Sequence, residues 1–133
     1  MSDSIFSRII HGEIPAYRLY EDDNCVIILD THPINPGHCL VIPRQQIDQF
    51  TDLGSELFVQ LCRVAHNYAS HLKKTLGCDR VALEIDGRDV PHVHIHLIPL
   101  SAGQQTFREG RFDEDVDHSA LRRMMEQLAQ THD

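Results

Sequence analysis

The chain has 133 residues, of which 41% are hydrophobic, and this length suits one domain with a single core. Its formal net charge of −8 argues against a broad surface for nucleic acid or membrane, and neither a secretory signal nor an apolar stretch of the roughly 20 residues that span a membrane is visible. Because the cysteines lie far apart and form no Cys-x-x-Cys pair, we expect free thiols and a cytoplasmic protein that binds neither a nucleic-acid polymer nor a membrane.

The first part of the chain predicts a short helix followed by a hairpin. Apolar residues at helical spacing near the N-terminus stop at Gly12 and Pro15, which break helices. A nearly continuous apolar run further on is typical of a strand covered on both faces. In chain order, we expect a helix over residues 4–10, strands over 18–20 and 25–30, a loop over 31–37 and a strand over 38–43.

The second part predicts a long helix, a second hairpin and a last helix. Apolar residues recur at helical spacing after Thr51 and Ser55, either of which is the expected N-cap of the long helix. Two hairpins and a long helix together make an α+β domain. In chain order, we expect the long helix to end at Gly77, strands over 80–85 and 91–99 joined by a turn over 86–89, a loop over 101–117, and a helix over 119–130 capped by Asp117.

The run from residue 91 to residue 99 alternates histidine with apolar residues. Because side chains alternate between the faces of a strand, His92, His94 and His96 are expected to share one face, roughly 7 Å apart. Imidazole serves as a nucleophile, an acid or base, or a metal ligand. The residues alone favour a nucleophilic site and a metal site equally, the latter with Asp89 as the nearest carboxylate. A pH-responsive structural cluster is the third alternative.

The sequence from His92 to Ile98 resembles the His-φ-His-φ-His-φ-φ motif, with φ apolar, of the histidine triad (HIT) family of nucleotide hydrolases and transferases. The segment Gly87–His92 is similar to the version in some microbial HIT-like proteins. Further resemblance, in family order, lies in residues 5–15, 20–23, 29–30 and 36–44. It implies one HIT-like domain over 1–133, with a family-like core over 5–100, a C-terminal extension with a helix over 101–133, an antiparallel sheet of about five strands, one long helix and short terminal helices.

The resemblance also implies a reaction. His94, the middle histidine, would attack the α-phosphorus of a purine nucleoside phosphoramidate or a dinucleoside polyphosphate and form a covalent nucleotidyl-histidine, which water hydrolyses. His92 and His96 would supply protons or hydrogen bonds, and His38 would orient the ring of the nucleophile. The family implies a homodimer and no cofactor. The alternative is a non-catalytic regulatory module that binds nucleotide.

The same resemblance assigns substrate contacts. Asp30 would accept hydrogen bonds from the ribose hydroxyls, and Asp89 would lie near the leaving group, where a carboxylate suits an amine and hence a phosphoramidate. Arg44 and Arg88 are the only basic residues expected to meet an anionic substrate. The residues expected around the base are Phe6, Ile28, Leu29 and Thr31.

Two departures from the family pattern carry expectations of their own. Some members hold structural zinc with two N-terminal cysteines and further histidines. This chain has Ser4 and Ser7 at the cysteine positions and Gln46 at one histidine position, so no metal is expected. The usual asparagine before the triad is also missing, and Glu84 or Asp86 lies nearby.

Overall fold

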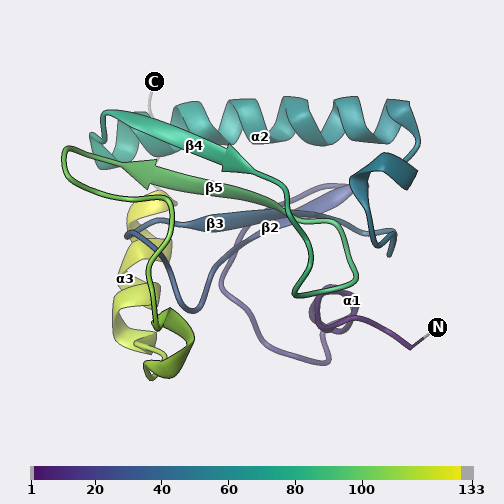
Figure 1. Cartoon of the computed structure of the whole chain (residues 1–133), viewed down its shortest axis with the longest axis horizontal. Coiled ribbons are helices and arrows are strands. Elements are labelled where there is room, and N and C mark those ends of the chain that lie inside the picture. Colours follow the sequence, from purple (N-terminus) through teal and green to yellow (C-terminus); the bar gives the residue numbers. More distant parts are fainter. Residues whose placement is uncertain (1, 130–133) are drawn as a thin grey trace.

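The computed structural model describes residues 2–129 as a five-stranded antiparallel sheet with helices against both faces (Figure 1). The strand order is β1-β2-β3-β5-β4, so β1 and β4 form the edges. This architecture confirms the predicted α+β class and the number of strands. The elements are α1 (Ile5–Ile10), β1 (Arg18–Glu21), β2 (Cys25–Leu29), β3 (Cys39–Pro43), the 3-10 helix η1 (Phe50–Asp52), α2 (Ser55–Leu76), β4 (Arg80–Glu84), β5 (Ile95–Leu100), the 3-10 helix η2 (Arg111–Asp113) and α3 (His118–Leu128).

The sheet buries apolar residues on both of its faces. Every residue of β2 is buried, as its unbroken apolar run predicts. Ile27 belongs to the core that includes residues of α2 and α3, whereas its neighbours Val26 and Ile28 pack with residues of α1. The short helix α1 therefore covers the face opposite α2, which Figure 1 shows.

Two of the three residues predicted to begin or end a helix are confirmed. Gly77 ends α2 in the left-handed conformation with φ 67°, as predicted. Asp117 caps α3 by accepting a hydrogen bond from the amide of Ala120, which is also as predicted. The predicted N-cap of α2 is wrong, because Gly54 holds that position and Thr51 lies in η1. The predicted end of the last helix, Gln130, lies outside the described residues.

The histidine run is only partly a strand. β5 begins at Ile95, so the predicted strand over 91–99 is wrong for its first half. There the amide of Val93 donates to the carbonyl of Ile47 at 2.7 Å, outside any strand ladder. Of the three histidines, only His96 therefore lies within a strand, since His92 and His94 precede β5. His96, within β5, pairs in register with Leu40 of β3 and Glu84 of β4.

The segment that follows β5 folds back onto the loop before β3. The side-chain amide of Asn35 donates to the carbonyls of Pro99 and Gln105, at 3.0 Å each. Arg108 donates to the carbonyl of Pro33 at 2.9 Å. These bonds fix residues 99–108 beside the loop that leads to His38. None of the helices within residues 2–129 has the length and apolar composition needed to cross a membrane.

Candidate active site

His94 lies immediately before β5 and is almost fully buried. Its Nδ1 lies 2.8 Å from the backbone carbonyl of His92. A carbonyl oxygen can only accept, so Nδ1 carries the hydrogen and donates it. In the neutral ring the lone pair is therefore on Nε2. The tautomer of His94 is thus set by its own backbone, two residues back.

The ring of His92 is also fully buried and is held at both nitrogens. Its Nε2 donates to the carbonyl of Pro43 at 2.8 Å, so Nδ1 is the acceptor and takes the hydroxyl hydrogen of Ser4 at 2.6 Å. Burial lowers the pKa of His92, which keeps the ring neutral at neutral pH. The predicted role of this ring as a proton donor at the substrate does not fit this position. Its backbone carbonyl, by contrast, contacts His94.

Ser4, Ser7 and Gln46 form a cluster of direct hydrogen bonds behind His92. Gln46 Oε1 accepts from the amide of Ser4 at 2.8 Å and from the hydroxyl of Ser7 at 2.7 Å. Ser4 Oγ in turn accepts from the amide of Ser7 at 3.0 Å. Zinc sites use thiolate, imidazole or carboxylate ligands. Here two hydroxyls and an amide stand around a histidine whose nitrogens are both engaged, so this cluster does not fit a zinc site.

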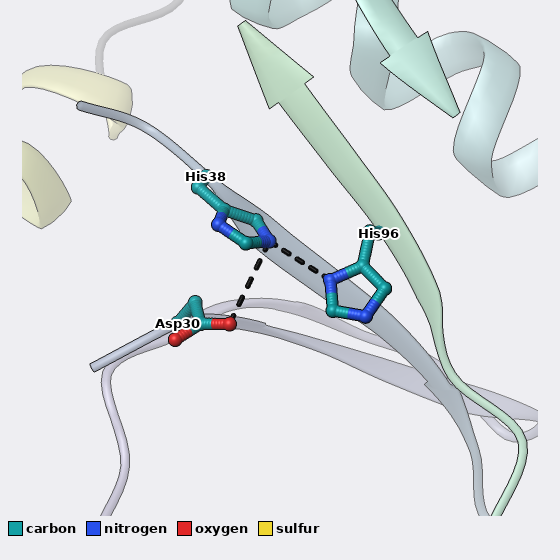
Figure 2. Close-up of side chains that lie close together, drawn as sticks. All are labelled: Asp30, His38 and His96. Atoms are coloured by element: carbon teal, nitrogen blue, oxygen red, sulfur yellow. Dashed lines mark hydrogen bonds and ion pairs between the residues drawn. The ribbon is translucent and has the colours of Figure 1, made fainter. Parts of the chain in front are cut away.

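A second histidine network joins His38, immediately before β3, to His96 of β5 (Figure 2), and the ring centroid of His96 lies 4.9 Å from that of His94. The amide of Ile34 donates to His38 Nδ1 at 3.0 Å, which leaves the hydrogen of His38 on Nε2. That Nε2 lies 2.9 Å from His96 Nδ1 and donates to it. The hydrogen of His96 is therefore on its own Nε2. Each bond sets the tautomer of the next ring.

Burial keeps this network neutral. It lowers the pKa of His38 to about 4 and also lowers the pKa of His96. Asp30, whose Oδ2 lies 3.6 Å from His38 Nε2, opposes this effect at His38. At neutral pH His96 is thus a neutral ring with an N–H group available as a donor.

Asp30, His38 and His96 also lie close enough together to suggest a cation site (Figure 2). The hydrogen bonds argue against one. A neutral imidazole has one lone pair, and the amide of Ile34 already occupies that of His38. A metal at His38 Nε2 would first have to displace the proton shared with His96. The hydrogen bonds of these three residues therefore do not fit a metal site.

A mostly apolar pocket of about 230 Å³ lies in front of His94 and His96. Phe6 from α1 forms one wall, and its ring meets the ring of His94 edge to face at a centroid distance of 4.9 Å. The structure brings to this one pocket the residues predicted to lie around the base, the ribose and the leaving group. They are Phe6, Ile28, Leu29, Asp30, Thr31 and Asp89.

A second, larger pocket of about 520 Å³ adjoins the first and is lined largely by charged residues. The two pockets share three lining residues, which are Asp89, His96 and Arg111. Asp89 Oδ1 lies 3.5 Å from Nε2 of His94. The basic nitrogen of His94 therefore lies near the place where the pockets meet.

Comparison with known proteins identifies the family of the chain. The model of the HIT domain family matches residues 11–103, which is more than half of the chain. The chain belongs to the HIT family.

Two HIT-family relatives and one solved structure illustrate the similarity. The chain is 34% identical over 103 residues to the adenylylsulfatase HINT3 of Arabidopsis thaliana; the match covers 74% of this chain and 52% of the plant protein, so the chain spans about half of that relative. It is 36% identical over 110 residues to an uncharacterized HIT-like protein of Methanocaldococcus jannaschii, with 74% and 80% covered. The crystal structure of a HIT-like protein involved in cell-cycle regulation from Bartonella henselae has a TM-score of 0.84 at 26% identity, with 97% of this chain and 98% of that chain covered.

The main residue of the site that sequence reasoning missed is Arg111. Of the two basic residues expected to meet an anionic substrate, Arg44 donates to the carbonyl of Asp22 and lines neither pocket. Arg88 lines only the larger pocket, where it donates to both carboxylate oxygens of Asp86. Arg111 instead lines both pockets. It lies beyond the HIT-like motifs, in a segment predicted only as a loop, and its one signal in the sequence is its charge. Of the residues considered in place of the missing family asparagine, Glu84 and Asp86 both line the larger pocket.

Proposed function

We propose that this HIT-family chain is a nucleotide hydrolase that cleaves at the α-phosphate of purine nucleoside phosphoramidates or dinucleoside polyphosphates through a nucleotidyl intermediate on His94. Membership of the family supports the coarser statement, a nucleotide hydrolase or nucleotide-binding protein of the HIT type. One observation carries the finer one. The bond from His94 Nδ1 to the carbonyl of His92 leaves the lone pair on Nε2, beside the pocket.

The reaction would proceed in two displacements. The lone pair of His94 Nε2 forms a bond to the α-phosphorus while the bond from phosphorus to the leaving group breaks, and the leaving group departs with that electron pair and takes up a proton. Water then attacks the phosphorus and gives up a proton. The bond from phosphorus to Nε2 breaks, and a nucleoside monophosphate is released with His94 restored.

His96 and Asp89 are the groups suited to the proton transfers. His96 carries its hydrogen on Nε2, because Nδ1 accepts from His38. This N–H is a fixed donor for a phosphoryl oxygen or for the departing group. Asp89 Oδ1 lies 3.5 Å from Nε2 of His94, and its side chain is 59% exposed, so water reaches its carboxylate. A carboxylate here favours an amine over an anionic leaving group.

The shape of the site supports a bound nucleoside. The smaller pocket offers apolar walls to a base, and the carboxylate of Asp30 stands at its edge for the ribose hydroxyls. A substrate with its nucleoside in this pocket and its leaving group in the larger one would place the scissile bond near His94. The name of the plant relative adds adenylyl sulfate to the substrates worth testing.

We also propose that the chain forms a homodimer by joining sheets. The edge strand β4 supports this, since an edge strand offers unpaired backbone groups to a second copy. Leu83 in that strand is 52% exposed. Sedimentation equilibrium tests the proposal: a mass of twice the 15.2 kDa chain is expected, and a monomer at micromolar concentration would contradict it.

The hydrolase proposal is tested by steady-state kinetics of the wild type and His94→Asn with adenosine phosphoramidate, diadenosine polyphosphate and adenylyl sulfate. Removal of the nucleophile should abolish turnover of every substrate that the wild type cleaves, because Asn cannot form the intermediate. His66→Asn, an exposed histidine on α2, is the matched control and should retain full activity. An active His94→Asn protein would overturn the mechanism. Binding of nucleotide without turnover by the wild type would favour the regulatory module instead.

A further inference from the structure

Arg111 reaches back from the C-terminal segment into the site. It begins η2, and its guanidinium meets Asp30, which lies 81 positions earlier in the chain. Only 11% of its side chain is exposed. A cation buried to this degree has lost most of its hydration, so the groups around it determine what it can bind.

The bonds of Arg111 leave part of its guanidinium unused. Nη1 donates to Asp30 Oδ2 at 3.3 Å and to the carbonyl of His32, and the guanidinium carbon lies 4.2 Å from the centroid of the Phe112 ring. Among the described residues, no partner accepts from Nε or Nη2. These contacts fix the plane of the guanidinium and leave three N–H hydrogens without a protein acceptor.

Arg111 lies where the two pockets meet. Arg111 is one of the three residues that line both pockets, together with His96 and Asp89. Its ionic partner is Asp30, whose Oδ2 lies 3.3 Å from Nη1, and Asp89 is the carboxylate that lines both pockets with it. The remaining arginines of the larger pocket each have a carboxylate partner, which is Asp86 for Arg88 and Glu114 for Arg108.

We propose that Arg111 binds the non-bridging oxygens of the phosphate that lies between the two pockets. The proposal rests on the proposed function, because it takes that phosphate to be the one that His94 attacks. A planar guanidinium suits a phosphate, to which it can donate two parallel hydrogen bonds. Negative charge on these oxygens is stabilised best by donors that are already fixed in place, and Asp30 and His32 hold Arg111 in that way.

Calorimetric titration of wild type and Arg111→Gln with AMP and with adenosine tests this assignment. Glutamine keeps a hydrogen-bonding side chain but removes the charge. AMP should bind at least about tenfold more weakly to Arg111→Gln, whereas the affinity for adenosine, which has no phosphate, should change less than about twofold. Arg111→Lys keeps the charge but lacks the planar guanidinium, so its affinity for AMP should lie between those of the wild type and Arg111→Gln. Arg123→Gln, an exposed arginine on α3, is the matched control and should bind both ligands as the wild type does.

The outcomes separate this inference from the hydrolase proposal. Equal weakening of the binding of AMP and of adenosine by Arg111→Gln would overturn the inference. Arg111 would then act only by holding the loop of Asp30 and His32 in place. Unchanged affinity for AMP would overturn the inference as well. If Arg111→Gln weakens the binding of AMP but not that of adenosine, and the wild type cleaves no substrate, the hydrolase proposal fails while phosphate binding by Arg111 stands. A wild type that binds neither ligand would overturn both. Thermal unfolding of each variant confirms that it is folded.

Discussion

The hydroxyl of Ser4 lies 2.6 Å from Nδ1 of His92, although 88 positions separate the two residues. This bond joins the start of α1 to the histidine run and places the carbonyl of His92 against His94. Ser4 also caps α1 by accepting from the amide of Ser7. A single hydroxyl therefore links the N-terminal helix to the orientation of the proposed nucleophile.

Replacing Ser4 by alanine should weaken both the fold and the reaction. It leaves a buried nitrogen of His92 without its donor and removes the helix cap, so we expect a loss of about 2 kcal/mol in the free energy of unfolding. We also expect a lower kcat with little change in KM, because the fault lies in the orientation of His94. Ser4→Thr keeps the hydroxyl and should restore most of both. Urea unfolding and steady-state kinetics measure them. Wild-type values of both stability and kcat in Ser4→Ala would contradict this account.

The buried ring of His38 should make stability depend on pH. Its pKa is lowered from 6.5 in the unfolded chain to about 4 in the fold. Between these values the unfolded chain binds a proton that the folded chain does not, so stability falls as the pH is lowered through this window and is complete above pH 6.5. Across this window the titration of His38 should lower the free energy of unfolding by about 3 kcal/mol, since each unit of pKa difference corresponds to about 1.4 kcal/mol.

Urea unfolding at several pH values between 4 and 7 measures this dependence. His38→Gln should show a clearly smaller loss of stability across the window than the wild type, because glutamine does not titrate. His66→Gln, on the exposed face of α2, should keep the wild-type dependence. If the free energy of unfolding depends on pH equally in the wild type and His38→Gln, groups other than His38 cause the dependence.

Gly37 is required for the turn that delivers His38 to β3. Its φ is +93°, and a Cβ here would lie 2.5 Å from Leu76 Cδ1 and 3.2 Å from Pro99 Cγ. Gly37→Ala therefore adds to the strain of the left-handed backbone a contact that Leu76 and Pro99 must move to relieve, and we expect it to destabilise the fold by about 2 kcal/mol. Gly12→Ala shares the positive φ but meets no atom within 4 Å, and it should cost only about 1 kcal/mol. Equal losses in urea unfolding would show that contact with Leu76 is unimportant.

Asp89 should influence which leaving group is preferred. Its carboxylate lies 3.5 Å from His94 Nε2 and lines the larger pocket. Asp89→Asn removes the negative charge at constant size, so the ratio of kcat/KM for an adenosine phosphoramidate to that for adenylyl sulfate should fall about tenfold. Glu126→Gln, an exposed carboxylate on α3 that lines neither pocket, should leave the ratio unchanged. An unchanged ratio in Asp89→Asn would place Asp89 outside the leaving-group site.

The parts of the fold that the sequence predicted are those with local patterns. The apolar run of β2, the helical spacing that ends at Gly77 and the cap at Asp117 each depend on neighbours in the chain, and the structure confirms all three. The histidine run also has a local pattern, that of a strand, but distant partners override it. Val93 bonds to Ile47, and the ring of His92 turns to Pro43 and Ser4.

The site divides in the same way. The family resemblance drew attention to His94, His96 and Asp30, and the structure brings all three to one pocket, because Asp30 follows β2, His94 precedes β5 and His96 lies within β5. Arg111 could not be predicted from a local motif, because its contact with Asp30 spans 81 positions and depends on how residues 101–117 fold back. No periodicity in that segment reports such a contact. The roles of all these residues in binding and catalysis stay predictions until tested.

The most direct test of the central claim is an intact-mass spectrum of the wild type and His94→Asn, taken after brief mixing with an adenosine phosphoramidate and quenching without strong acid. We expect a transient adduct of one nucleoside monophosphate on the wild type, release of AMP, and neither on the variant, because the bond to phosphorus forms at His94 Nε2. An adduct of the same mass on His94→Asn, or AMP release by that variant at the wild-type rate, would contradict the assignment of His94 as the nucleophile.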